Sequence, residues 1–539
     1  MSITSVNNDL PGIPDSFRFG VATASYQVEG GINGPGEPAN NWSLWEALGR
    51  VEPSGLACDF WRKYEDQLDL VAGMGCNGFR MSVEWARIEP QEGDIDTDAL
   101  EGYGRILDAC HERGIQPLVT LHHFTHPAFL GEEFWLRPDS PQRFAAFVEI
   151  VLGALGDKCS QWVTINEMNM LAIASYAFPV FPPGRLLDFN DAFITLFHLL
   201  EAHVRAYEVI HRLQGGAVVG FNNYALSIYE LDRMLPDLLL ARSHGVAKED
   251  LGTFLRERRA EHYMGLSPPD PLEAGLRAMA KSMLLPAGMG AHGRSRISRA
   301  LDGLRGLFMS DDDTVAGNQY DRSDPFKFLM DSFGRLLDVL GSRFKVGTDS
   351  LERLVEVVWS SPYERTMDVS QFDYYDPAAS HELKVPGRRT TGGRVMTPRR
   401  MLWEMSPDPT ALVSWCRLEG EPGLDTWVVE NGMCNRVRNG RSYRRLDGWD
   451  RARYLRENIA AVVAARDAGL PVTAYYHWTL VDNYEWGSYQ PRFGIYGMDR
   501  ERGLKIMDTD AMGVDAAGTY RSIIEGLRRG DRTVLLPER

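Results

Sequence analysis

Cysteine, positive charge and long apolar runs are all scarce in this sequence of 539 residues. The six cysteines are scattered and form no Cys-x-x-Cys pair, which excludes a small disulfide framework and predicts a reducing, cytoplasmic location. A formal net charge of −16 argues against a nucleic-acid partner, because phosphate binding needs a basic surface. No run of about 18 apolar residues occurs, so no transmembrane segment is expected. Residues 1–17 have neither the basic nor the apolar region of a signal peptide.

What the chain does contain is an alternation of short β-rich runs and helical patterns. The runs are almost continuously apolar, which is typical of parallel strands buried on both faces. Between them, apolar residues recur at i, i+3 and i+4. Eight such strands predict an α/β fold of the (β/α)8 type, the TIM barrel, rather than a doubly wound sheet. The expected strands are residues 17–24, 77–85, 115–124, 161–168, 217–225, 370–376, 426–432 and 472–480, and the expected helices include 98–114, 141–156, 193–213 and 451–469.

A long excursion, residues 226–369, separates the fifth and sixth expected strands. It contains a locally basic stretch at 277–310 and a segment with apolar residues on one helical face at 325–344. Because no second catalytic motif lies in it, we expect one catalytic domain over residues 1–539 with a rim insertion at 226–369. A solvated lid and a contact between copies of the chain, which would make a homo-oligomer, both fit such a segment.

Polar side chains gather at the carboxyl ends of the expected strands. Barrel enzymes build their sites at that rim, where the strand ends converge. Two of these residues, Glu167 in TINEMN (164–169) and Glu430 in WVVENGM (427–433), follow the fourth and seventh strands. Two carboxyl groups that face one cleft can hydrolyse a glycosidic bond, one as proton donor and the other as nucleophile or base. Arg80, from the second strand, can hold one of them ionised.

Aromatic residues lie in or beside the same strand ends and loops. Aromatic faces stack on the C–H faces of sugar rings, although each ring taken singly is equally typical of a core. The segment VDNYEW (481–486) is harder to explain as core, because Glu485 and Trp486 both lie beyond a strand end. The aromatic candidates are Tyr375, Trp403, Trp478, Trp486, Tyr489 and Phe493.

Six blocks, in order along the chain, resemble glycoside hydrolase family 1, the retaining β-glucosidase and β-galactosidase type. They run from about residue 14 to 510 and leave mainly the excursion uncovered. The blocks are FRFGVATASYQVEG (17–30), GFRMSVEWARIEP (78–90), TLHHFTHP (120–127), TINEMN (164–169), WVVENGM (427–433) and YYHWTLVDNYEWGSYQPRFGIYGMD (475–499).

Carried over by position, the resemblance implies that Glu167 is the general acid/base and Glu430 the nucleophile, with no metal or other cofactor. Arg80 and Tyr375 then contact and position the nucleophile, and Asn166 touches the sugar 2-hydroxyl, where contacts strengthen in the transition state. The implied partner is a small-molecule β-glycoside. The remaining implied sugar contacts are Gln27, His123, Trp478, Glu485 and Trp486, with Trp403 on the aglycone side.

The sequence departs from the family pattern at several positions. Phe124 stands where the family usually has a sugar-contacting tryptophan, and Asp373 where it has an asparagine beside the site. Met168 replaces a frequent proline, and Val429 replaces the threonine before the nucleophile. Phe124 and Asp373 leave the choice among glucoside, galactoside and fucoside open.

Several alternatives stay open beside a hydrolase of terminal β-glucosides. A retaining enzyme becomes a transglycosylase when another acceptor outcompetes water, and a 6-phospho-β-glycosidase or a non-catalytic carbohydrate-binding barrel would share most blocks. His122 and His126, four residues apart, would suit a metal only on a helix, whereas a strand end and a loop are expected here. The basic, apolar excursion is also consistent with a hydrophobic aglycone, such as that of a lipid glycoside at a membrane surface.

Overall fold

The computed structural model describes residues 12–177, 179–186, 188–226, 229–265, 348–375, 383–384, 394–395, 407–438 and 441–536. The basic stretch 277–310, the segment 325–344 and Trp403 lie outside these residues. Within them, no helix combines the length and the apolar character needed to cross a membrane.

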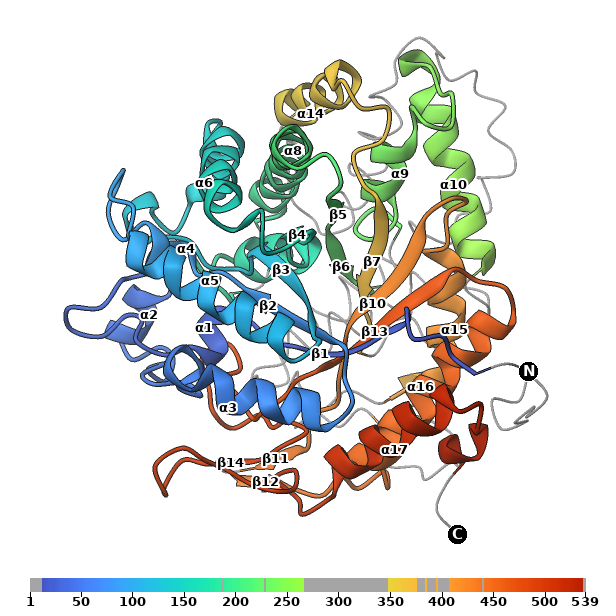
Figure 1. Ribbon diagram of the computed structural model, residues 1–539. Helices are drawn as coiled ribbons and strands as arrows, with labels where there is room; N and C mark the ends of the chain where they lie inside the picture. The colour runs from blue at the N-terminus through green and yellow to red at the C-terminus, as the bar shows by residue number, and fades with distance from the viewer. Residues whose placement is uncertain are drawn as a thin grey trace, which may run out of the picture.

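A parallel sheet of nine strands forms the centre of the molecule (Figure 1). Its order is β5-β4-β3-β2-β1-β13-β10-β7-β6. The two strands at the ends of this order are consecutive in the chain, because only Phe221 separates β5 from β6. The sheet therefore closes on itself at this interrupted strand, and eight strand positions make the predicted TIM barrel. The strands are β1 (Arg18–Ala22), β2 (Gly78–Ser82), β3 (Gln116–His122), β4 (Gln161–Ile165), β5 (Val218–Gly220), β6 (Asn222–Tyr224), β7 (Val369–Asp373), β10 (Asp425–Asn431) and β13 (Val472–Trp478).

All eight expected strands occur at the predicted places. The amino ends agree to within one residue, and each strand ends one to three residues earlier than predicted, because the polar residues that follow it belong to the loops of the rim. Two apolar clusters cover the two faces of the sheet. The smaller fills the barrel interior and includes Leu118, Val163, Val429 and Tyr476, and the larger lies between the sheet and the surrounding helices.

Helices surround the barrel (Figure 1). Five of them begin after an aspartate whose side chain accepts a hydrogen bond from a backbone N–H three residues further on, which satisfies a donor that the helix leaves free. The long helices are α3 (Phe60–Gly73), α5 (Thr97–Glu112), α6 (Ser140–Leu155), α8 (Phe189–Leu213), α15 (Pro409–Leu418), α16 (Arg451–Asp467) and α17 (Ala516–Arg528). Short helices α1 (Ser25–Val28), α2 (Ser43–Ala47), α4 (Trp85–Ile88), α7 (Met168–Ala172) and η3 (Ile173–Ala177) lie in the loops.

Three helices belong to the described part of the excursion: α9 (Met234–Leu240), α10 (Leu251–Gly265) and α14 (Thr348–Ser360). The first two pack against each other, α10 also contacts α15, and α14 packs on α8. Buried Arg233, next to α9, pairs with Asp237 of α9 and with Glu419 and Glu421 of the loop between α15 and β10. This cluster attaches the start of the excursion to the barrel wall.

Candidate active site

Glu167 and Glu430 come together at the carboxyl ends of their strands. Glu167 follows β4 and precedes α7, with a left-handed backbone (φ 38°, ψ 61°) that is uncommon outside glycine and typical of functional sites. Glu430 lies near the end of β10, where its carbonyl accepts a hydrogen bond from the Tyr374 N–H at 2.8 Å. One carboxyl oxygen of Glu167 lies within 4.8 Å of one of Glu430. Both side chains are buried, at 7% and 3% exposure.

Arg80 of β2 organises the floor between them. Its Nη1 donates to Glu430 Oε1 at 2.7 Å, and its Nη2 donates to Asn166 Oδ1 at 2.5 Å. Its Nε donates to Thr120 Oγ1 at 3.1 Å, and the side chain is fully buried. A guanidinium with partners on three sides cannot swing away, so its charge is fixed under the carboxylate of Glu430.

The two glutamates differ in what surrounds them. Glu430 receives hydrogen bonds on both oxygens, from Arg80 and from the Tyr375 hydroxyl at 2.6 Å. Burial raises its pKa, and Arg80 and Tyr375 act against that rise. Burial and then the charge of Glu430 hold the pKa of Glu167 well above its usual range. The arrangement therefore favours an ionised Glu430 and a protonated Glu167, which is the division that acid-assisted nucleophilic attack needs.

The inner end of the pocket is lined by hydrogen-bonding groups. Glu485 Oε1 accepts from the Trp478 indole at 2.9 Å, and its Oε2 accepts from Gln27 Nε2 at 3.1 Å. Burial raises the pKa of Glu485 to about 8. Gln27 Oε1 and His123 Nδ1 are buried and have no hydrogen-bond partner within the described residues. Buried polar atoms of this kind form hydrogen bonds with a ligand or with water, so these two atoms are available to a polar ligand.

Aromatic rings hold His123 in place. Its imidazole lies parallel to Trp478 on one side and Trp486 on the other, with centroids 6.0 and 5.8 Å away. His123 Nε2 lies 3.3 Å from Asn166 Nδ2. Burial, and next the charge of Arg80, keep the pKa of His123 well below its usual range, so the ring is a neutral hydrogen-bonding group.

The structure thus brings together every predicted site residue that it describes except Tyr489, which lies against Tyr484 and Arg500 and donates to the Ser54 carbonyl outside the pocket. The prediction missed part of the wall, which comes from α7, η3, the loop after them and β6. These residues are apolar or aromatic and carry no polar signal in the sequence. They are Met170, Ala174, Val180, Phe181 and Tyr224, and Phe124 and Phe493 complete the lining.

Comparison with known proteins agrees with this geometry. The family model described as glycosyl hydrolase family 1 matches residues 11–255 and 363–512. The chain belongs to glycosyl hydrolase family 1. The residues between the two matched parts, 256–362, lie inside the excursion. As a member of this family the protein is a glycoside hydrolase of the β-glycosidase class.

Relatives of this family 1 hydrolase carry several specificities. It is 25% identical over 520 residues to 6-phospho-beta-galactosidase 1 of Streptococcus pneumoniae serotype 4, covering 94% of this chain and 98% of that protein. It is 25% identical over 505 residues to 1,4-beta-D-glucan glucohydrolase of Thermotoga neapolitana, covering 92% and 95%. Coniferin beta-glucosidase of Pinus contorta is 31% identical over 240 residues, so the match spans 40% of this chain and about half (47%) of that protein.

Solved structures share the fold. A beta-glucosidase from Thermotoga maritima, in complex with deoxynojirimycin, superposes with a TM-score of 0.64 at 21% identity, covering 96% of this chain and 99% of that one. A beta-glycosidase from Pyrococcus horikoshii gives 0.59 at 22% identity, covering 98% and 99%. At these identities the likeness supports the TIM barrel itself.

In the pocket of this family 1 hydrolase, an arginine side chain occupies the position that a metal ion would take beside the carboxyl groups. Among the described residues, the acidic or histidine side chains close enough to share a metal are Glu167, Asp373 and Glu430, and the Arg80 guanidinium already lies against two of them. His122 and His126 do not join this group. Their rings lie 6.1 Å apart, and burial holds the pKa of both well below the usual value.

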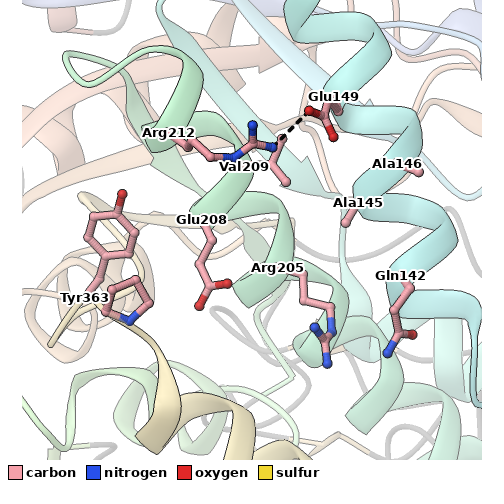
Figure 2. A pocket seen from close by; sticks show the side chains of 10 residues that line it. Gln142, Ala145, Ala146, Glu149, Arg205, Glu208, Val209, Arg212 and Tyr363 are labelled. Carbon is pink, nitrogen blue, oxygen red and sulfur yellow. Dashed lines mark hydrogen bonds and ion pairs between the residues drawn. The ribbon is translucent and has the colours of Figure 1, made fainter.

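A second hollow lies outside the barrel, between α6 and α8 (Figure 2). Its glutamate Glu149 is half exposed and forms a 3.0 Å ion pair with Arg212, as the dashed line shows. Ala145, Ala146 and Val209 supply its apolar part. Exposed ion pairs of this kind contribute little stability and do not perturb a carboxylate for chemistry. The paired glutamates of the barrel mouth therefore remain the candidate active site.

Proposed function

We propose that this protein is a retaining exo-β-glycosidase that hydrolyses terminal β-D-glucosides or closely related β-glycosides. The observation that carries the proposal is the short gap between the two carboxyl groups, whose nearest oxygens lie within 4.8 Å. Retaining glycosidases place their carboxyl groups about 5 Å apart, whereas inverting enzymes leave room for a water between them. Burial below 10% exposure at both residues keeps bulk water from the reaction.

The proposed reaction has two steps. Glu430 attacks the anomeric carbon while Glu167 gives its proton to the leaving oxygen, so that an ester to Glu430 forms and the glycosidic bond breaks. Glu167 then takes a proton from water, whose oxygen attacks the same carbon and releases Glu430. Arg80 and Tyr375 orient the nucleophile through their hydrogen bonds to its two oxygens.

The inner end of the pocket favours an unphosphorylated sugar. Gln27, His123, Asn166 and Glu485 offer amide, imidazole and carboxyl groups to hydroxyls. Apart from Arg80, which Glu430 and Asn166 already hold, the described lining includes no lysine or arginine to pair with a phosphate. One relative is named a 6-phospho-beta-galactosidase, but the side chains here support a neutral glycone. A pocket closed by Trp478 and Glu485 binds the end of a glycoside, which supports exo action.

The outer wall supports an apolar aglycone. Met170 and Ala174 line the pocket from α7 and η3, the elements that directly follow Glu167, which donates to the leaving group in this proposal. Val180 and Tyr224 line it with them. Burial of an aryl or alkyl aglycone against such a wall contributes about 25 cal/mol for each Å² removed from water.

We also propose a reducing location and a single catalytic unit that includes the excursion. All six cysteines are buried and unpaired, which suits a reducing compartment. The buried Arg233 cluster, which attaches α9 to the loop before β10, supports treating the excursion as part of the barrel.

Trapping the intermediate tests the proposal. We expect 2-deoxy-2-fluoro-β-glucosyl or -galactosyl donors with good leaving groups to form a stable adduct on Glu430, found by intact mass and peptide mapping. Glu430→Gln should lose the adduct. Glu167→Ala should lower kcat/KM for poor leaving groups about 10²–10⁴-fold and much less for activated ones. No adduct in folded protein would favour a binding module, and glycosyl transfer to added alcohols in place of hydrolysis would favour a transglycosylase.

A further inference from the structure

A third carboxyl group lies on the pocket floor. Oxygens of Asp373, Glu167 and Glu430 all lie within 4.8 Å of one another, and Asp373 is fully buried at the end of β7. Among the described residues the one cation in contact is Arg80, whose Nη1 lies 2.7 Å from Glu430 Oε1 and 3.6 Å from Asp373 Oδ1. Three ionised carboxylates and one guanidinium would together place a net charge of −2 in a site that is buried away from water. Buried like charges at this separation are relieved by binding protons.

The other ionisable groups around the three carboxyls do not compensate this charge. His123, from β3, is neutral because of burial. The Tyr375 hydroxyl, which follows β7, donates to Glu430 and stays protonated, since burial raises its pKa well above the usual value. Glu485, at the inner end of the same pocket, is neutral near pH 7 because burial raises its pKa to about 8, so it supplies no positive charge. Tyr224 of β6 stacks its ring on Tyr375 at 5.6 Å. Some of the three carboxyl groups on the pocket floor must therefore be protonated.

Hydrogen bonding indicates where such a proton resides. Both oxygens of Glu430 already accept bonds, from Arg80 and Tyr375. Asp373 Oδ2 accepts a short bond from Asn222 Nδ2, whereas Asp373 Oδ1 has no hydrogen-bond partner within the described residues. The backbone fixes this position, because Asp373 is in register with Glu430 on one side and its carbonyl accepts from Ala225 on the other. Oδ1, which lies 3.6 Å from Arg80 Nη1 and accepts no hydrogen bond within the described residues, is the oxygen of Asp373 that can carry a proton.

We propose that Asp373 is a protonated carboxylic acid in the working enzyme and shares its proton with Glu167, as a positioning residue for the acid/base. The inference rests on the proposed function. In the resting state Glu430 is −1, Arg80 is +1, and Glu167 and Asp373 are neutral. In the glycosyl-enzyme, Glu430 is a neutral ester and Glu167, having given its proton to the leaving oxygen, is −1. Asp373 then donates its Oδ1–H to Glu167, and the floor stays neutral in both states.

Asp373→Asn tests the coupling, because an amide has the same shape but cannot share a proton. In the wild type the pair holds two protons. After the first leaves, the second is shared by the two interacting carboxyls and stays available to Glu167, and it leaves at a higher pH than the proton of Glu167 alone. We expect the alkaline limb of kcat/KM in Asp373→Asn to move to lower pH by about one unit. We also expect kcat/KM at its own optimum to fall less than about tenfold, since the amide still donates. An unmoved limb would contradict the proposal, because a merely structural role leaves the limb in place.

Infrared difference spectra test the proton directly and need no substrate. We would compare Glu167→Gln with Glu167→Gln/Asp373→Asn at neutral pH, in H2O and in D2O. Loss of the carbonyl stretch of a protonated carboxyl in the double variant supports the proposal, and loss of carboxylate bands overturns it. If Asp373→Asn does not fold, Asp373→Ser takes its place. A protein inactive on every glycoside would contradict the proposed function and leave this readout intact.

Discussion

At the scale of single residues, the neighbours of a carboxyl group decide its chemistry. Glu430 and Glu167 have the same side chain and nearly the same burial. Glu430 accepts hydrogen bonds from an arginine and a tyrosine, whereas Glu167 faces two further carboxyl groups without such donors among the described residues. The first is stabilised as an anion, and the second keeps its proton to higher pH. The roles proposed for them follow from this difference.

Removing the tyrosine should therefore change the nucleophile. Tyr375→Phe deletes the 2.6 Å donor to Glu430, so the pKa of Glu430 rises and the acid limb of kcat/KM moves to higher pH. A hydrogen bond to a charged group contributes about 1.5–3 kcal/mol, so we expect kcat/KM to fall about 10–100-fold. The measurement is a pH–rate profile on an aryl glycoside.

Tyr475→Phe is the matched control. Its hydroxyl is also out of contact with bulk water, in a residue that is fully buried where Tyr375 is partly buried, but it donates to the neutral side chain of Asn431 at 2.8 Å. It should lower stability without moving the acid limb. Equal shifts in the two variants would mean that the hydroxyl of Tyr375 has no specific effect on Glu430.

The sequence predicted these residues unevenly. Glu167, Glu430, Arg80 and Gln27 lie in polar motifs at strand ends, where a buried sheet gives no other reason for charge. Which donor serves which oxygen could not be predicted, because the bond from Arg80 to Glu430 joins residues 350 positions apart. Val180 and Phe181 were missed since apolar loop residues look like core, and only the folded loop shows that they line a pocket.

At the scale of elements, the loop after β10 depends on a very close contact. A Cβ on Gly432 would lie 2.3 Å from the Trp478 carbonyl oxygen, which is backbone and cannot rotate away. Gly432→Ala must therefore displace the end of β10, with Glu430 two residues before it, or the end of β13. Since a shift of about 1 Å can cost about 10²-fold in rate, we expect kcat/KM to fall about 10–100-fold.

Gly216→Ala is the control for this prediction. Nothing lies within 4 Å of its added Cβ, and its backbone is not left-handed. Kinetics and thermal unfolding of both variants separate a displaced nucleophile from general destabilisation. Unchanged kinetics in Gly432→Ala would show that the strand ends adapt.

The attachment of α9 gives a second prediction at this scale. Arg233→Ala leaves buried Glu419 without its arginine, and leaves Asp237 and Glu421 with Arg258 as their one remaining arginine among the described residues. Breaking a buried charge network in this way costs about 3–5 kcal/mol. Arg212→Ala, which breaks the exposed pair with Glu149, should change stability by less than about 1 kcal/mol. Urea unfolding of both variants is the measurement, and similar small effects would contradict a role in attachment.

Strands were predicted better than the excursion. Continuous apolar runs such as residues 115–124 specify a buried parallel strand almost unaided, and β3 occupies 116–122. The break at Phe221, which divides the fifth strand into β5 and β6, left no mark in the sequence, because it arises from how the barrel closes.

For the whole molecule, buried ionisable groups predict how stability depends on pH. Burial raises the pKa of Glu84 to about 7 and of Glu485 to about 8. Between the ordinary pKa of a glutamate and these values, the unfolded chain is ionised and the folded chain is not, so stability falls as pH rises. Buried histidines such as His126 and His203, whose pKa values are lowered to about 4, have the opposite effect, so that stability falls as pH is lowered. They do so only below about pH 6.5, where the unfolded chain begins to bind protons at histidine.

Above pH 6.5 the histidines are neutral in both states, and the buried carboxyl groups remain. They are Glu84 and Glu485, together with Glu167 and Asp373, because burial raises the pKa of the last two well above the usual range as well. We expect the free energy of unfolding to fall by more than about 2 kcal/mol between pH 6.5 and 8, since each group contributes about 1.4 kcal/mol per pH unit. Glu485→Gln, which cannot ionise, should make this slope measurably shallower. Urea titrations at the two pH values check it, and stability that stays level or rises over this interval would contradict the prediction.

The excursion leaves the barrel after β6 and returns at β7, and these strands are hydrogen-bonded neighbours, with Asn222 opposite Gln371 and Tyr224 opposite Asp373. Because the strands are parallel, the chain leaves at the carboxyl end of β6 and returns at the amino end of β7, so the two ends of the excursion are held at a fixed separation of about one strand length, whatever lies between them. Doubling the length of a flexible connection between fixed ends costs only about 0.6 kcal/mol. In evolutionary terms, selection against added residues at this point is weak. The segment can lengthen or shorten among descendants while the register of every strand, and the pocket, are inherited unchanged.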